Sequence, residues 1–317
     1  MGNTVKTIAQ AAPRSSAWRT VKREYVLYFM LLPALGFTLV FNYLPMGMNV
    51  IAFMDYKLTS GWLGLGSKWV GFYQFSRFLS DPTFYEVTLR TILYAAAKLV
   101  VSFPAPIFLA LLLNELRSQA FKRTVQTISY LPFFVSWVTV AGLIYMFLSI
   151  SSTGIINTAI AALGGKKTIF MSRAQYFLPV MLFSTLWKGV GLGSIIYLAT
   201  IASIEQQLYE AARIDGAGRW KQLLHITLPG IMPAVIIILI LNAGTIFSAD
   251  FDQIVNLQNN VIQTDTDVIN VYSYHVGVSQ RRYAQGTAIS LFQAAINFSL
   301  VWLTNLIAKR VRGTGLF

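Results

Sequence analysis

Apolar residues are gathered into six long runs that are separated by shorter polar intervals. The runs carry few or no charges and cover residues 27–53, 91–113, 124–149, 176–203, 227–249 and 287–308. Each run reaches the about 20 residues that a helix needs to cross a hydrocarbon core of roughly 30 Å. The short alternating segments of a membrane β-barrel are absent from the sequence. The pattern predicts an all-α polytopic membrane protein with six transmembrane helices.

The composition supports this interpretation and gives the predicted spans a direction. The 317 residues are 55% hydrophobic and 12% charged, whereas a soluble domain carries roughly 25% charged residues. With the amino terminus placed in the cytoplasm, the inner segments hold 14 Lys and Arg residues and the outer segments hold 9. This positive-inside bias predicts that both termini are cytoplasmic. It also accounts for the net charge of +13 without a nucleic-acid partner.

The ends of the apolar runs suggest the domain organisation. Residues 1–24 are polar and basic and are expected to form a cytoplasmic tail, whereas residues 25–317 are expected to form a single transmembrane domain. The first run is longer than a signal-peptide core, and no small-residue cleavage site follows it, which favours an uncleaved anchor. Asp81-Pro82 is expected to begin the turn into the second span. The absence of cysteine excludes disulfides, thiolate metal sites and a Cys nucleophile.

One inner interval, residues 204–226, has an unusual pattern. From Glu210 to Pro233 the chain reads EAARIDGAGRWKQLLHITLPGIMP, a polar segment between two long apolar runs. A polar helix-turn-helix has little to contribute within lipid, so we expect it to contact another protein. The alternative is an ordinary hairpin between two spans that happens to be rich in alanine and glycine.

We expect residues 203–225 to form two short helices. Their apolar residues lie on or near one face of each helix: Leu208, Ala211 and Ala212 on the first, and Trp220, Leu223 and Leu224 on the second. Gly216 and Gly218 are expected to reverse the chain, because glycine tolerates a positive φ. Asp215 is expected to cap the second helix. Pro229 and Pro233 are expected to mark where the chain re-enters the membrane.

The spacing E-A-A-x2-D-G-A-x8-I-x-L-P resembles the signature loop of permease subunits in ATP-binding-cassette (ABC) importers. The resemblance spans roughly residues 24–317. The stretches WKGVGLGSIIYLATIASIEQQLYEAARIDGAGRW and NLIAKRVRGTGLF are similar to carbohydrate-type permeases. They are most similar to the branch that imports oligosaccharides and polysaccharide fragments, which includes importers of alginate.

This resemblance implies a type I importer fold in the bacterial inner membrane, with partners that the chain itself does not encode. These are a second, homologous permease, two copies of an ATPase and an extracytoplasmic solute-binding protein. ATP and Mg²⁺ would be bound by the ATPase, and the permease would need no cofactor of its own. By the same resemblance, the element that docks into the ATPase would comprise Glu210, Ala211, Ala212, Asp215, Gly216 and Leu228.

Lys188 lies near the middle of the fourth run, beside Trp187. A charge at the bilayer centre costs about 2.5–3.5 kcal/mol on insertion scales, so its side chain should face a cavity or a partner. Lys188 either lines a translocation path and bonds a sugar hydroxyl or carboxylate, or it pairs with a neighbouring carbonyl or a second permease. Lys98 is placed nearer the outer end and is expected to snorkel. Three glycines predict a locally unwound or closely packed segment: Gly189, Gly191 and Gly193.

Sugar recognition uses aromatic faces and side-chain amides, and several such residues lie in or beside the predicted spans. The further candidates for the substrate path are Tyr197, Asn242, Phe247, Asp250, Gln293 and Asn297. Aromatic and amide side chains in membrane helices also pack against or bond to neighbouring helices, which is the alternative for each of them.

Two other classes of function remain to be weighed. A membrane enzyme is disfavoured because the sequence lacks H-E-x-x-H and G-x-S-x-G, and its two histidines, His225 and His275, lie on opposite predicted sides. The chain also lacks the G-x4-G-K-[ST] phosphate-binding loop. A closer alternative is an ABC permease for glycerol phosphate or an amino acid. Basic pairs at Lys166-Lys167 and Arg281-Arg282 are compatible with an anionic polysaccharide such as alginate, but they do not identify the sugar.

Overall fold

The computed structural model describes Lys22 and residues 24–57, 59, 61, 66–245 and 251–312, with side chains to residue 310. These residues are helical apart from turns, loops and a short antiparallel pair, β1 (Met54–Asp55) with β2 (Lys68–Trp69). The chain divides into two compact units, Met1–Val50 and Ile51–Phe317. The expected tail, residues 1–24, lies outside the described residues except for Lys22 and Glu24.

The first unit contains a single apolar helix. It runs through α2 (Tyr25–Thr38), the π-helical turn η1 (Leu39–Tyr43) and α3 (Leu44–Gly47), and continues as η2 (Met48–Phe53). The whole segment Tyr25–Phe53 is 29 residues long and apolar enough to cross a membrane. No side chain of α2, η1 or α3 is buried. A helix that is apolar all round is typical of a membrane span.

The second unit contains four more continuous helices that are long and apolar enough to cross a membrane. They are Pro82–Glu115, Ala174–Ala202, Arg219–Ala243 and Tyr283–Arg310. The elements that form them are α5 (Pro82–Val101), α6 (Pro104–Glu115), η6 (Ala174–Tyr176), α10 (Phe177–Ala202), α12 (Arg219–Gln222), η7 (Leu223–Thr227), α13 (Leu228–Ala243) and α17 (Tyr283–Arg312). The predicted start of the second span is confirmed, because Asp81 Oδ1 accepts a hydrogen bond from the backbone N–H of Thr83 at 2.9 Å and so caps α5.

The third predicted span is broken in the structure. It comprises α7 (Gln119–Tyr130), η4 (Leu131–Phe134) and α8 (Trp137–Phe147), and the two halves meet at an angle of 101°. Val135 is extended, and Ser136 begins a new helix by accepting a hydrogen bond from the N–H of Thr139 at 3.2 Å. The described residues therefore hold five candidate spans, or six when the bent pair counts as one.

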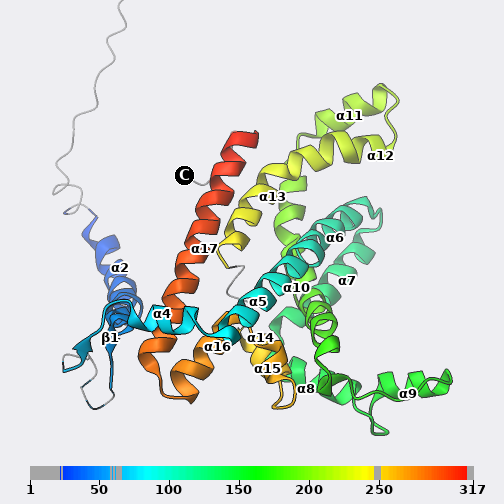
Figure 1. Cartoon of the computed structure of the whole chain (residues 1–317). Coiled ribbons are helices and arrows are strands. Elements are labelled where there is room, and N and C mark those ends of the chain that lie inside the picture. Colours follow the sequence, from blue (N-terminus) through cyan, green and yellow to red (C-terminus); the bar gives the residue numbers. More distant parts are fainter. Residues whose placement is uncertain are drawn as a thin grey trace, which may run out of the picture. The chain divides into compact units, whose positions relative to one another are not determined.

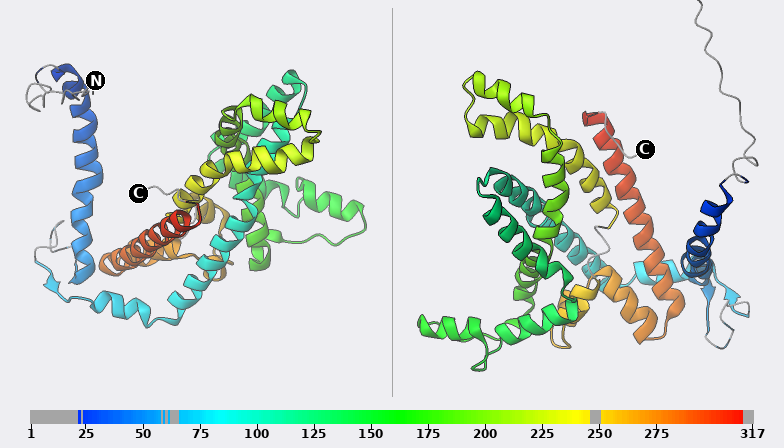
Figure 2. Two further views of the ribbon diagram at one scale, coloured as in Figure 1. Left: turned by 90° about the horizontal axis from the view of Figure 1, so that it is seen from above. Right: turned by 180° about the vertical axis from the view of Figure 1, so that it is seen from behind.

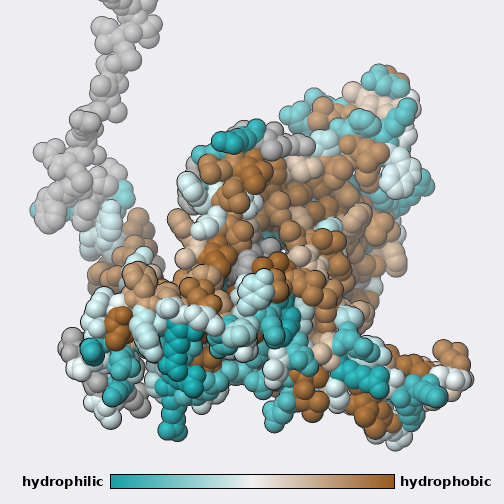
Figure 3. Space-filling view, viewed as in Figure 1, coloured by the Kyte–Doolittle hydropathy of each residue, from teal (hydrophilic) through white to brown (hydrophobic). Residues whose placement is uncertain are grey.

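Short helices collect at the two ends of the second unit (Figures 1 and 2). At one end, α11 (Gln206–Ile214) joins α10 to α12. The opposite end carries α4 (Tyr73–Leu79), α9 (Ile155–Ala162), η5 (Phe170–Ser172), α14 (Phe251–Leu257), α15 (Gln263–Thr266), α16 (Ile269–Tyr274) and the π-helical η8 (His275–Ser279). Hydrophobic side chains cover the long helices between these ends, and hydrophilic ones gather along the lower edge of the same view (Figure 3).

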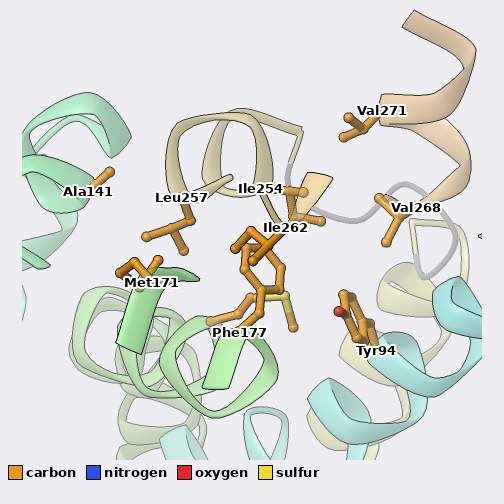
Figure 4. Packing of buried hydrophobic residues seen from close by; sticks show 10 residues of the cluster. Tyr94, Ala141, Met171, Phe177, Ile254, Leu257, Ile262, Val268 and Val271 are labelled. Carbon is orange, nitrogen blue, oxygen red and sulfur yellow. The ribbon is translucent and has the colours of Figure 1, made fainter. Parts of the chain in front are cut away.

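Helix α10 is the centre of the packing, with α6, α7 and α13 against it. A Cβ added at Gly191 would overlap the carbonyl group of Ser129 in α7, and one added at Gly193 would lie 3.0 Å from the ring of Pro106 in α6. The glycine segment is therefore helical rather than unwound, and it is closely packed at Gly191 and Gly193. Nearer the α14 end, Tyr94, Phe177 and Ile254 belong to one buried cluster that joins α5, α10 and α14 (Figure 4).

Candidate functional site

The segment with the unusual E-A-A pattern forms a helical hairpin, α11–α12. Helix α11 ends in a tight turn in which the N–H of Ala217 donates to the carbonyl of Ala212 at 2.8 Å. The N–H of Gly216 donates to the carbonyl of Arg213 at 3.1 Å, and Gly216 has φ of +75°. This left-handed residue after a helix is the position that glycine occupies most readily. The predicted role of Gly216 is therefore confirmed.

Three expectations for this hairpin were wrong. Gly218 has φ of −67° and is the N-cap of α12, so it contributes no left-handed turn. Asp215 is the C-cap residue of α11, and no side chain caps α12. The second helix is not short, because Arg219–Ala243 is continuous. Within this continuous helix, the π-helical turn η7 comes directly before α13, and Pro229, at the second position of α13, leaves a carbonyl of the preceding turn without its N–H donor.

Side-chain contacts fix the hairpin to the ends of the long helices. The hydroxyls of Tyr209 and Thr227 lie 2.9 Å apart and connect α11 to η7. The Gln222 amide donates to the carbonyl of Ala217 at 2.7 Å. Arg219 pairs with Glu115 at the end of α6, with the charged groups 3.5 Å apart. The hairpin is thus held to η7, which continues into α13, and to the end of α6.

The residues implied in docking are presented on this hairpin. Glu210, Ala211, Asp215 and Gly216 are exposed, and Ala212 is half-buried. Leu228 lies at the first position of α13, where it is half-buried. Large apolar side chains are exposed beside them, with Ile214 at 87% and Trp220 at 77%. Such exposure indicates a surface that another molecule covers.

Lys188 lies at the break between η4 and α8. Its ammonium donates to the carbonyl of Phe133 at 2.6 Å and to that of Val135. It also lies 5.4 Å from the ring centroids of both Phe133 and Trp137. Because the break interrupts the helical ladder, these two carbonyls need another donor. The contact agrees with the interpretation in which Lys188 pairs with neighbouring carbonyls.

The other substrate-path candidates lie on three helices. Trp187 is 41% exposed on α10, whereas Tyr197 is buried with Ala110 and Ile231 in the contact between α6, α10 and α13. Asn242 is exposed in the last turn of α13, and Gln293 and Asn297 lie on the neighbouring α17, buried and half-buried respectively. Phe247 and Asp250 lie outside the described residues.

Sequence reasoning missed a polar contact inside the second unit. Gln253 of α14 is fully buried; its side-chain oxygen accepts from the Lys98 ammonium at 3.3 Å, and its amide donates to the carbonyl of Met181 at 2.8 Å. Lys98 was expected near the outer end of a span. Its partner Gln253 belongs to α14, at the end of the second unit opposite α11. The one signal of this contact in the sequence was the polar residue Gln253 itself, which lies in the predicted loop between the fifth and sixth apolar runs.

A second buried polar group lies at the α14–α16 end. The carboxylate of Asp267 accepts from the Gln258 amide at 3.0 Å and lies 3.4 Å from Nδ1 of His275. Arg90 donates to the backbone carbonyls of Thr264 and Asp267. Burial raises the pKa of the Asp267 carboxyl above its ordinary value, against the opposing effect of His275. These contacts fasten α15 to α5 and to η8.

Comparisons with known proteins extend these observations. A family model described as "Binding-protein-dependent transport system inner membrane component" matches residues 102–313. Protein LplB of Bacillus subtilis (strain 168) is 39% identical, with 96% of each chain covered. The polygalacturonan/rhamnogalacturonan transport system permease protein YteP of the same organism is also 39% identical, covering 94% of this chain and 92% of YteP.

A solved structure is similar over nearly the whole chain. It is a bacterial alginate ABC transporter in complex with an alginate pentasaccharide-bound periplasmic protein. The TM-score is 0.85 at 35% identity, and the match covers 95% of this chain and all of the other.

Proposed function

The chain belongs to the family of binding-protein-dependent transport system inner membrane components, the permeases of ABC importers, and we propose that it moves acidic oligosaccharides across the cytoplasmic membrane. The observation that supports this most strongly is the similarity to the alginate transporter, at a TM-score of 0.85 over 95% of the chain. Polygalacturonan, which names the YteP system, is like alginate a polymer of uronic acids. Two relatives of comparable identity thus share a carboxylated sugar as cargo.

The proposed translocation path uses side chains that suit a sugar chain. Asn242 and Asn297 provide amides on the neighbouring helices α13 and α17. The two helices are close here, because Gly244, two residues after Asn242, lies against Val301, which is one turn beyond Asn297. Gln293 adds a further amide, and Trp187 offers an exposed aromatic face. Phe247 and Asp250, which lie outside the described residues, remain candidates for the path, while Tyr197 and Lys188 support it through packing and the carbonyl contacts.

The substrate class is tested by uptake into membrane vesicles that contain the assembled importer and its binding protein. We expect a uronic acid pentasaccharide to be taken up about tenfold faster than a neutral glucose pentasaccharide, because one charge-assisted hydrogen bond contributes about 1.5 kcal/mol or more. Equal uptake of the two sugars would contradict the acidic specificity. Uptake of glycerol phosphate or an amino acid in place of either sugar would support the corresponding alternative permease.

We further propose the assembly in which the chain works. A second, homologous permease completes the path, and two ATPase subunits that bind ATP and Mg²⁺ contact the α11–α12 hairpin. Both termini and this hairpin face the cytoplasm, while the α14–α16 end faces the extracytoplasmic binding protein. The exposed Glu210 supplies an anion for a basic residue of the ATPase, and the small side chains of Ala211 and Ala212 permit close approach. Closure of the ATPase pair then moves α11 and, through its contacts, α6 and α13.

The docking is tested with single cysteines, since the chain has none of its own. We expect Ala212→Cys and Ile214→Cys to form crosslinks to the ATPase subunit, because both residues lie on α11. The matched control is Leu163→Cys, which is 89% exposed beside α9 at the opposite end of the second unit and should give no ATPase crosslink. Equal crosslinking of the ATPase at Leu163→Cys and at the two α11 positions would contradict this docking. So would the absence of any crosslink from α11 in an active complex.

A further inference from the structure

A polar cavity lies between the end of α6 and the α11–α12 hairpin. Its volume is about 240 Å³. The residues that line it include three arginines and several hydrogen-bonding groups: Arg117, Arg213, Arg219, Glu115, Tyr209 and Gln222. This cavity lies between α11 and the end of α6, and its residues come from two stretches that are far apart in the sequence, 114–117 and 209–227.

The charges around this cavity favour an anion. Three guanidinium groups line it, from Arg117, Arg213 and Arg219, whereas Glu115 is the one carboxylate among the lining residues. Glu115 is engaged by Arg219 at 3.5 Å. The lining therefore carries an excess of two positive charges. Arginine presents a planar fork of donors that matches the oxygens of a phosphate group.

An apolar groove of about 340 Å³ continues from the polar cavity. The two share Glu115, Arg219 and Leu223, and the groove is completed by apolar side chains of α6 and α12: Phe108, Leu111, Leu112 and Trp220. Phe108 is 63% exposed and Leu112 is 67% exposed, although both belong to the candidate span Pro82–Glu115. The groove thus begins at a charged site and extends along a membrane helix.

We propose that the cavity and groove together bind one anionic glycerophospholipid. The phosphate lies among Arg117, Arg213 and Arg219, and an acyl chain lies in the groove against Phe108 and Leu112. The proposal rests on the proposed function for one point, namely that this end of the protein faces the cytoplasmic leaflet. A basic pocket at the ends of membrane helices on that side is suited to anionic lipid head groups.

Two features distinguish a lipid from other occupants. A free phosphate would use the arginines alone and leave the adjoining groove empty, whereas a lipid fills both. A zwitterionic lipid would fit the groove but brings its own cation toward the excess positive charge. Trp220, at the border of groove and solvent, is a residue type that is enriched at the level of lipid head groups. A bound lipid would join α6 to the hairpin that contacts the ATPase.

The test measures lipid retention by the assembled importer in detergent, using native mass spectrometry. The complex is offered phosphatidylglycerol, phosphatidylcholine or inorganic phosphate. We expect phosphatidylglycerol to be retained in preference to phosphatidylcholine, and inorganic phosphate not to displace it. Removing two arginines with Arg117→Gln and Arg219→Gln should weaken phosphatidylglycerol binding by about fivefold for each charge. Arg123→Gln on α7, which is exposed and does not line the cavity, is the matched control and should leave binding unchanged.

Equal retention of phosphatidylglycerol and phosphatidylcholine would overturn the proposal. It would also be overturned if Arg123→Gln weakened phosphatidylglycerol binding as much as the cavity substitutions do. Displacement by inorganic phosphate would show that the arginines bind a free anion instead. The comparison of lipids uses the unaltered complex, so the proposal can be tested even if the double variant fails to assemble. The ATPase content and ATP hydrolysis of the same preparation are recorded in parallel. Loss of the ATPase would contradict the proposed function, whereas an active complex without lipid preference would contradict only the lipid site.

Discussion

Replacing Gly191 by alanine is expected to prevent assembly of the second unit and to abolish uptake. The added Cβ would overlap the carbonyl of Ser129, so α10 could not approach α7 as closely as it does. The obstacle is backbone, which cannot rotate away as a side chain can. Overpacking of this kind costs about 3 kcal/mol. The measurement is the amount of folded complex in the membrane and its midpoint of thermal unfolding.

The same helix offers the control for this substitution. A Cβ at Gly189 would meet no atom within 4 Å, although Gly189 lies only two residues earlier in α10. Gly189→Ala should therefore give normal abundance and uptake, and its higher helix propensity should slightly stabilise α10. If both alanine variants assemble equally well, the close packing of α10 on α7 is not required, and this prediction is wrong.

Replacing Lys188 by methionine is expected to destabilise the protein by about 3 kcal/mol. Methionine keeps much of the length of the side chain but removes the donor that satisfies the carbonyls of Phe133 and Val135. A carbonyl that loses its donor costs about 1–3 kcal/mol where water cannot take the donor's place, as in a membrane. The loss of the cation–π contacts with Phe133 and Trp137 adds to this. The thermal midpoint and the abundance of the complex should both fall.

This variant also separates the two interpretations of Lys188. A structural role predicts reduced abundance with normal uptake per assembled complex, whereas a substrate contact predicts normal abundance with reduced uptake. Asn242→Ala is the companion variant, because Asn242 is exposed and is proposed to face the sugar. We expect Asn242→Ala to reduce uptake without affecting abundance. If Lys188→Met reduced uptake at normal abundance and Asn242→Ala reduced abundance, Lys188 would be the sugar contact and Asn242 the structural residue.

Hydropathy and local signals predicted most of the helices. The apolar runs give the positions of the spans because a membrane helix needs an uninterrupted apolar length, and Asp81-Pro82 marks the start of α5 as a cap followed by a first-turn proline. The break in the third span was missed, although its signals are present. Pro132 begins η4, and Ser136 begins α8 as an N-cap. Between two apolar segments these local signals are weaker than the hydropathy of the whole run.

The contacts at the candidate sites were harder to predict, because they depend on which helices become neighbours. The E-A-A pattern identified α11 and the left-handed Gly216, since both follow from residues close together in the sequence. In contrast, Lys188 contacts carbonyls that are 53 and 55 residues away, and Lys98 contacts Gln253 across 155 residues. The identity of the residues indicated that each lysine needs a partner, but the partner itself depends on the tertiary structure.

The continuous helix from Arg219 to Ala243, which includes the π-helical turn η7, has a mechanical consequence. At 1.5 Å per residue its 25 residues form a rod about 37 Å long, with the docking hairpin at one end and Asn242 near the other. If such a rod pivots by about 10°, its far end sweeps about 6 Å, comparable to the rise of one helical turn. A small rotation of the hairpin is thus magnified at the proposed sugar path, and no hinge within the rod is needed to carry it there.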